Sequence, residues 1–186
     1  MGRSALLVTA YIACLKAGLA FMPLDKRLPV DRLRLMVQNA KCRLMLTNGN
    51  GPLSGEMDSV DLSQHTEIML SAPIVNLPSV TSHQLSNIVY TSGSTGTPKA
   101  IMIEHQGMMN LCAPETTIWK RKSLIGLTTS VSFDPSGFQI FTALLGGSQL
   151  YCLADDGTFD AQEYQNFIVN SRKYFRSSLC LLVNLD

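Results

Sequence analysis

Short apolar runs with strand character alternate along the chain with longer segments of helical periodicity, and this alternation constrains the fold more than any other feature. Strand-like runs include CRLMLT (residues 42–47), SNIVYT (86–91) and SQLYCL (148–153). The segment VDRLRLMVQNA (30–40) places its apolar residues on one helical face. Strands that alternate with helices predict an α/β fold, in which a largely parallel sheet is covered by helices on both faces.

The same patterns predict further elements. Helices are expected at 105–113, 138–147 and 160–172, and strands at 123–133 and 177–186. The helix at 160–172 brings Tyr164, Phe167 and Ile168 to one face. The Asp-Pro-Ser-Gly sequence at 134–137 predicts a turn. Residues 48–86 are polar and rich in turn residues, so a surface connection is expected there.

The first residues, MGRSALLVTAYIACLKAG, admit two interpretations. One arginine followed by a mostly apolar run resembles a weak secretory signal. However, Lys16 closes the run, and apolar side chains recur at helical spacing at Val8, Tyr11, Ile12 and Leu15. We therefore expect a buried helix here.

The composition indicates a chain with a large core and few charges for its surface. Of the 186 residues, 46% are hydrophobic and 16% are charged, whereas an ordinary globular domain has about 25% charged residues. Such a chain either associates or lacks part of the structure that would cover it. The net charge is +1 and the lysines and arginines do not cluster, so neither nucleic acid nor a membrane is an expected partner. No apolar run is long enough to span a bilayer.

The cysteines argue against a disulfide framework. There are five, they are widely spaced, and no two form a CxxC pair. The three histidines lie at no metal-ligand spacing relative to them. Reduced thiols, and hence a cytoplasmic location, are the simpler expectation.

The glycine-rich stretch TSGSTGTPK (91–99) has two possible roles on its own chemistry. Its glycines, hydroxyls and final lysine suit a loop that cradles phosphate through converging backbone N–H groups. It does not fit the P-loop, because Pro98 stands where that pattern needs glycine, and it lacks the third glycine of the dinucleotide-binding fingerprint. An ordinary Ser/Gly spacer remains the alternative.

Three stretches, in order, resemble segments of one enzyme family. They are LKAGLAFMPLDKRLPVDRL (15–33), YTSGSTGTPKAIMIEH (90–105) and SFDPSGFQIFTALLGGSQL (132–150). The chain is similar to the adenylate-forming, or AMP-binding, enzymes, and the SGSTG form is typical of the amino-acid-activating adenylation domains of nonribosomal peptide synthetases. The resemblance is strongest over residues 5–150 and implies that residues 1–186 are an N-terminal fragment of such a domain, made of part of its large α/β subdomain.

The resemblance implies a ligase chemistry and a set of site residues. Family members join an amino acid to ATP as aminoacyl-AMP, release pyrophosphate, and pass the acyl group to the phosphopantetheine thiol of a carrier domain, usually with Mg²⁺. The residues implied to bind the ATP phosphates are Thr91, Ser92, Gly93, Ser94, Thr95, Gly96 and Lys99. Those implied to bind the amino acid are Asp134, which would face its ammonium, and Pro135 and Phe138. Carrier and condensation domains are the implied partners.

Departures from the family pattern limit the activity that the resemblance implies for this chain. Ala100 replaces a usual glycine, where a methyl group would be strained if the backbone were left-handed, and Gln139 stands where Glu is common. No N-x-Y-G-P-T-E or Y-R-T-G-D segment occurs, and the C-terminal subdomain with its adenylate-contacting lysine is absent. We expect the isolated chain to be inactive. A fragment of an acyl-CoA ligase, or a non-catalytic nucleotide-binding or interaction remnant, remains an alternative, and the amino acid cannot be named.

Overall fold

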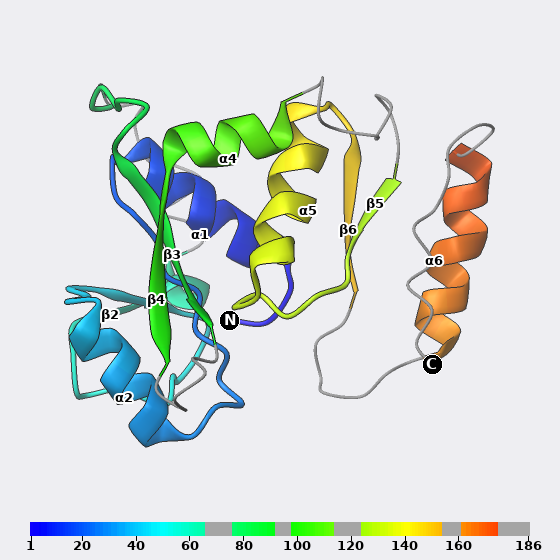
Figure 1. Ribbon diagram of the computed structural model, residues 1–186. Helices are drawn as coiled ribbons and strands as arrows, with labels where there is room; N and C mark the ends of the chain where they lie inside the picture. Colours follow the sequence, from blue (N-terminus) through cyan, green and yellow to red (C-terminus); the bar gives the residue numbers. More distant parts are fainter. Residues whose placement is uncertain (66–75, 92–97, 114–123, 154–160, 175–186) are drawn as a thin grey trace.

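The computed structural model describes residues 1–65, 76–91, 98–113, 124–153 and 161–174 (Figure 1). Its helices are α1 (Ala5–Lys16), α2 (Val30–Asn39), the 3₁₀ turn η1 (Leu62–Gln64), α4 (His105–Cys112), α5 (Asp134–Leu145) and α6 (Ala161–Tyr174). Its strands are β1 (Met45–Thr47), β2 (Ser59–Asp61), β3 (Leu85–Thr91), β4 (Lys99–Glu104), β5 (Leu124–Leu127) and β6 (Gln149–Cys152).

The strands form three separate pairs within the described residues. The pairs β1–β2 and β5–β6 are parallel, while β3 and β4 form an antiparallel hairpin. The helix α5 connects β5 to β6 and lies against both strands (Figure 1), which is the expected way to cross between parallel neighbours. The mixed α/β class is therefore as predicted. The hairpin departs from the parallel pattern because only residues 92–98 separate its two strands, which is too few for a crossover connection.

The first helix, α1, is part of the core, as predicted. The Ser4 hydroxyl accepts a hydrogen bond from the Leu7 amide at 3.3 Å and caps the helix start. Val8 and Tyr11 face inward, and the Tyr11 ring stacks on Phe21 with 4.0 Å between centroids. Burial of this apolar face anchors the helix to the rest of the fold.

Two apolar clusters hold the described elements together. The larger joins α1, α4, β5 and α5, and includes Leu127 and Ile140, which are both fully buried. The smaller lies under α6, where Phe167 packs with Leu124 and Leu153. Tyr164 and Ile168 pack against the smaller cluster, which confirms that α6 turns these aromatic and aliphatic side chains toward the sheet.

Several predicted boundaries differ from the structure. The turn expected at 134–137 is the first turn of α5, because a proline is tolerated at the start of a helix where its missing N–H has no partner to lose. The strand expected at 123–133 ends at Leu127. The surface connection at 48–86 contains β2, η1 and the buried Leu53. The strand expected at 177–186 lies outside the described residues.

The described helices and cysteines give two further findings. None of these helices is long and apolar enough to cross a membrane. Cys14, Cys42, Cys112 and Cys152 are free thiols, and burial raises the pKa of each.

Candidate functional site

The hairpin β3–β4 brings together the two ends of the glycine-rich stretch. Thr91 ends β3 and Lys99 begins β4, and the two residues are partners in the antiparallel register. Both are exposed. The predicted phosphate-binding residues between them, Ser92, Gly93, Ser94, Thr95 and Gly96, lie outside the described residues. The strand ends therefore place a hydroxyl and a cation at the base of the loop.

Ala100 fits the strand without strain. It pairs with Tyr90 in the hairpin register. Lys41, with φ of 52°, is the only residue other than glycine with positive φ among those described. The backbone at Ala100 is therefore extended, and the methyl group that replaces the usual glycine is tolerated there.

The predicted amino-acid-binding residues lie together at the start of α5. Asp134 is the first helical residue and is exposed, and Pro135 follows it in the first turn. A carboxylate at this position is stabilised by the positive end of the helix dipole. Phe138 lies one turn further along, is partly buried, and packs against the larger core cluster. A carboxylate in the first helical turn can attract a ligand ammonium.

The segment between β5 and α5 is held by hydrogen bonds to the side chain of Gln139. Its Oε1 accepts from the Thr128 amide at 3.2 Å and from the Thr129 hydroxyl at 3.2 Å, while its Nε2 donates to the Thr128 hydroxyl at 3.1 Å. A glutamate could make the accepting contacts but could not donate. The departure from the family pattern at Gln139 therefore keeps the contacts to the end of β5.

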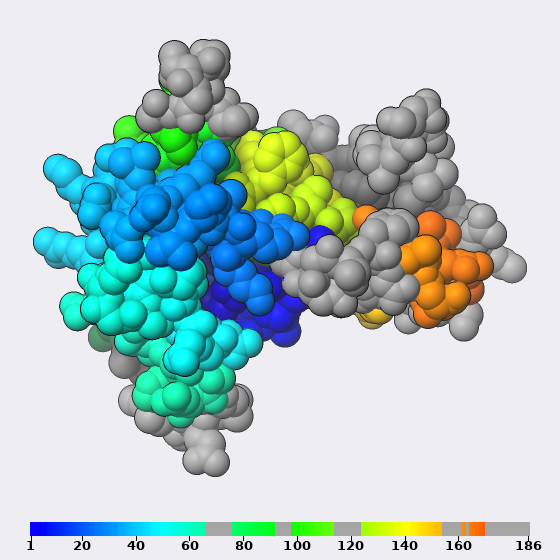
Figure 2. Space-filling view, turned by 90° about the horizontal axis from the view of Figure 1, so that it is seen from below, coloured from blue at the N-terminus to red at the C-terminus, as the bar shows by residue number. Residues whose placement is uncertain are grey.

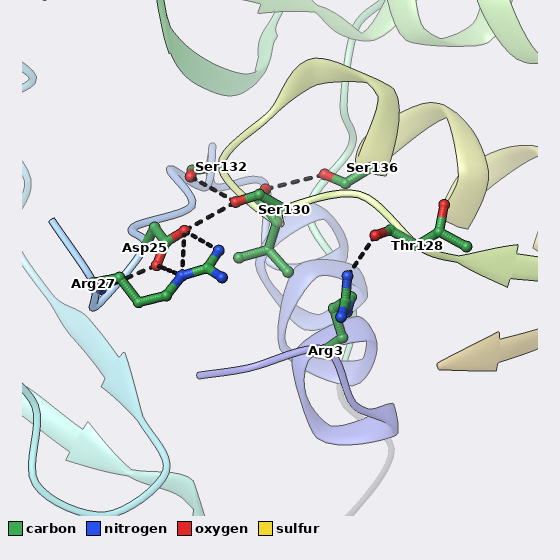
Figure 3. A network of polar contacts seen from close by, with 8 residues as sticks. Arg3, Asp25, Arg27, Thr128, Ser130, Ser132 and Ser136 are labelled. Carbon is green, nitrogen blue, oxygen red and sulfur yellow. Dashed lines mark hydrogen bonds and ion pairs between the residues drawn. The ribbon is translucent and has the colours of Figure 1, made fainter. Parts of the chain in front are cut away.

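Asp25 ties a distant stretch, the PLD segment (Pro23-Leu24-Asp25), to the segment between β5 and α5 (Figure 3). Its Oδ2 accepts a hydrogen bond from the Ser130 hydroxyl at 3.0 Å, and its Oδ1 accepts from the Arg27 amide at 3.0 Å and the Arg27 Nε at 2.8 Å. The hydrogen bond from the Arg27 side chain is the main cause that lowers the pKa of Asp25 to about 2. The carboxylate therefore contacts both its own turn and a segment that follows β5.

Arg3 makes a second long-range tie (Figure 3). Its Nε donates to the Leu153 carbonyl at 3.0 Å, and its Nη1 donates to the Thr128 carbonyl. The N-terminal segment is thereby joined to the carboxyl ends of both β5 and β6. Sequence reasoning missed this residue, since a single arginine carries no pattern.

The strand ends next to the glycine-rich stretch and the start of α5 point the same way. In Figure 1 the ends of β3 and β4 next to this stretch are the lower ends of these strands, and the first turn of α5 is the lower end of that helix. Seen from that end in Figure 2, the yellow-green surface of the β5–α5 region lies beside the blue surface that includes α2. Thr91 and Lys99, the described members of the phosphate group, thus lie at strand ends that point the same way as the start of α5, where Asp134 lies.

Two cavities accompany this arrangement. An apolar cavity of about 510 Å³ lies among α1, α4 and α5, and none of the predicted site residues lines it. A much smaller recess lies beside Asp134 and is lined by Tyr11, Asn87 and Ser136. The Tyr11 hydroxyl is buried with no hydrogen-bond partner among the described residues, and burial raises its pKa.

Metal-binding side chains do not cluster among the described residues. No group of three or more His, Cys, Asp or Glu side chains comes together among them.

Comparison with known proteins places this geometry in a family. The sequence model described as "AMP-binding enzyme" matches residues 1–172. The chain is 38% identical to surfactin synthase subunit 2 of Bacillus subtilis (strain 168), covering 89% of this chain and 5% of that protein. The chain thus spans a small part of the length of this relative.

Solved structures share the fold. The N-terminal subdomain of NpsA from Klebsiella oxytoca superimposes with a TM-score of 0.82 at 23% identity, over 91% of this chain and 45% of that one. Holo-PA1221, a nonribosomal peptide synthetase protein containing adenylation and PCP domains, gives a TM-score of 0.77 at 26% identity, over 91% and 29%. With the family match over residues 1–172, the chain belongs to the AMP-binding enzyme family.

Proposed function

We propose that residues 1–186 are part of an amino-acid-activating adenylation domain. They would supply the residues that bind the phosphates of ATP and the ammonium of the amino acid. The observation that carries this proposal is the hairpin, which sets Thr91 opposite Lys99 at the two ends of TSGSTGTPK. In a simple spacer the two ends need not be paired in a strand register. The family match over residues 1–172 supports the same conclusion.

The proposed reaction is the attack of an amino-acid carboxylate oxygen on the α-phosphorus of ATP. A phosphorus–oxygen bond forms to the carboxylate, the bond to the β-phosphate oxygen breaks, and pyrophosphate leaves with its electron pair. Lys99 would neutralise charge on the leaving phosphates, which is the main way such transfers are accelerated. Asp134 would hold the substrate ammonium and orient the carboxylate.

Mg²⁺ belongs to the family chemistry, and the described residues contain no group of three or more His, Cys, Asp or Glu side chains that would mark its ligands. We therefore assign it no ligand in this chain and route no step through it. The contribution proposed for this chain is binding and charge neutralisation by its own loop and helix end.

The acyl group would then pass to a phosphopantetheine thiol on a carrier domain, with a condensation domain as a further partner. The similarity to PA1221, which contains adenylation and PCP domains, supports the carrier partner. The free thiols among the described cysteines suit the reducing cytoplasm that we propose as the location.

Turnover is not expected from the 186 residues alone. The sequence contains neither the segment that stacks on adenine nor the one that binds the ribose hydroxyls in the family. We propose that the chain binds the phosphate end of ATP but forms no aminoacyl-AMP by itself.

ATP–pyrophosphate exchange across a panel of amino acids and fatty acids, combined with ATP binding by calorimetry, tests the proposal. We expect ATP binding that Lys99→Ala weakens, and no exchange by the purified chain. Exchange with fatty acids would favour an acyl-CoA ligase. Robust exchange with an amino acid would contradict the inactivity, while absence of ATP binding by the wild-type chain would contradict the phosphate role.

A further inference from the structure

We infer that Asp25 is a positioning residue for the amino-acid site: through Ser130, it fixes the segment that presents Asp134. The inference rests on the role proposed for Asp134. It joins two of the sequence motifs, the PLD segment and the segment that begins α5, which lie 105 residues apart at the points of contact.

The contact between the two segments is a hydrogen bond to a charged group in a sheltered position. The Asp25 side chain is only 14% exposed. The Ser130 hydroxyl donates to its Oδ2 at 3.0 Å. Hydrogen bonds to carboxylates are about twice as strong as those between neutral groups, so this bond is well suited to fix a loop.

The carboxylate is itself held in one orientation. Arg27 donates to it from its backbone amide at 3.0 Å and from its Nε at 2.8 Å. These contacts come from the same short turn, two residues along the chain. The acceptor that meets Ser130 is therefore oriented before the loop contacts it, which is what a positioning group requires.

Ser130 transmits this anchoring to Asp134 over a few bonds. Its carbonyl accepts from the Phe133 amide at 3.0 Å, which closes a turn that ends next to Asp134. The Phe133 carbonyl in turn accepts from the Ser136 amide at 2.9 Å. A displacement of Ser130 would therefore move the first turn of α5.

Contacts within the β5–α5–β6 unit hold several neighbouring residues, and two segments from outside this unit add contacts, Arg3 at the Thr128 carbonyl and Asp25 at the Ser130 hydroxyl. Gln139 on α5 bonds Thr128 and Thr129, and the Ser136 hydroxyl donates to the Val131 carbonyl at 3.0 Å. Among the described contacts, the Ser130 side chain bonds Asp25 and lies 3.2 Å from the Ser132 hydroxyl. Loss of the Asp25 contact should loosen this stretch without unfolding the unit.

Hydrogen–deuterium exchange on the full 186-residue chain tests the inference, with peptides covering residues 128–136 compared with peptides from α1. Ser130→Ala and Asp25→Ala each remove the tie from one side, and we expect exchange in 128–136 to rise about tenfold, as for the loss of a bond to a charged group. Asp25→Asn keeps an acceptor and should restore most of the protection. Arg27→Gln removes the side-chain hydrogen bonds that orient the carboxylate and should raise exchange in 128–136 less than Ser130→Ala does. Lys26→Ala, at an exposed lysine next to Asp25, is the matched control and should change exchange in 128–136 by less than about twofold.

The outcomes separate positioning from general stability. If Ser130→Ala leaves exchange in 128–136 unchanged, or raises it equally in α1, the inference is overturned. Ser130→Ala decides the matter even if Asp25→Ala fails to fold. Where the wild-type chain shows exchange of pyrophosphate into ATP, both variants should raise the KM for the amino acid and leave the KM for ATP unchanged. Absence of that activity is the result expected for the 186 residues alone, and loss of ATP binding would contradict the proposed function; in both cases hydrogen–deuterium exchange still decides the role of Asp25.

Discussion

The hairpin β3–β4 and the unit β5–α5–β6 carry the two halves of the proposed site and are built differently. The hairpin is held by its backbone ladder, and Ile101 and Met102 on β4 are 47% and 73% exposed. The unit encloses Leu127 and Ile140, both at 0% exposure, and its connection into α5 is fixed by side-chain hydrogen bonds. A phosphate loop must open and close, whereas a carboxylate that selects an ammonium must stay in place.

Truncation of one isoleucine to alanine in each region should give the largest difference in the free energy of unfolding. Ile140→Ala removes a fully buried side chain from the core, so we expect a loss of about 2–5 kcal/mol in the free energy of unfolding. Ile101→Ala on the hairpin should cost less than about 1 kcal/mol. Urea unfolding followed by circular dichroism measures both. Equal losses would mean that β4 is covered in solution and that the contrast is wrong.

Glycine-to-alanine changes measure how tightly the backbone is packed in the β5–α5–β6 unit and beside the hairpin. A Cβ at Gly126 on β5 would lie 2.8 Å from the Phe167 ring, so Gly126→Ala should lower the free energy of unfolding by about 1–3 kcal/mol. Gly107 on α4, next to the hairpin, has nothing closer than 3.8 Å. Gly107→Ala should raise stability by about 0.5–1 kcal/mol, because alanine favours the helix. Thermal melts of the two variants would contradict the packing if both moved in the same direction.

The Asp25 carboxylate, which is held chiefly by Arg27 and also accepts from Ser130, should give a specific pH dependence. Its pKa is about 2 in the folded chain, below its usual value of 3.8, so ionised Asp25 stabilises the fold above about pH 4 and this contribution is lost as pH falls toward 2. The contribution is at most about 2 kcal/mol, because Arg27 is half exposed and solvent screens the pair. Urea unfolding of the wild-type chain and Asp25→Asn measures it. Their stabilities should converge between pH 4 and pH 2, and a constant difference would contradict the pairing of ionised Asp25 with Arg27.

Tyr11→Phe should have the smallest effect. The Tyr11 hydroxyl is buried beside the unit with no partner among the described residues, so its removal saves a desolvation cost and keeps the stacking on Phe21. We expect the free energy of unfolding to be unchanged or to rise by up to about 1 kcal/mol. A loss of more than 1 kcal/mol in urea unfolding would show that the hydroxyl is bonded.

Some of this architecture follows from local sequence and some does not. The helical spacing of apolar residues in α1 and α6 predicts which faces are buried, because an apolar helix face is stable only when it packs against a core. The sequence predicts a turn at the start of α5, since Asp-Pro-Ser-Gly suits both a turn and the first turn of a helix.

The long-range ties were beyond sequence reasoning for a different physical reason. The Asp25–Ser130 and Arg3–Thr128 contacts join residues more than 100 positions apart, and no local periodicity encodes them. A partial signal was present at the end of β5, where the polar run Thr128, Thr129 and Ser130 follows an apolar strand. The carboxyl ends of parallel strands are where α/β proteins place their binding groups.

The most direct test of the central claim is calorimetric binding of inorganic pyrophosphate to the wild-type chain, to Lys99→Ala and to the control Lys26→Ala, an exposed lysine elsewhere on the surface. Pyrophosphate has no adenosine, so its binding tests the phosphate-binding residues alone and does not depend on the adenine and ribose segments that do not occur in this sequence. The account predicts that Lys99→Ala weakens binding about tenfold or more, while Lys26→Ala changes it by less than about twofold. Equal binding by all three proteins, or none by the wild-type chain, would contradict the assignment of the glycine-rich stretch as a phosphate cradle.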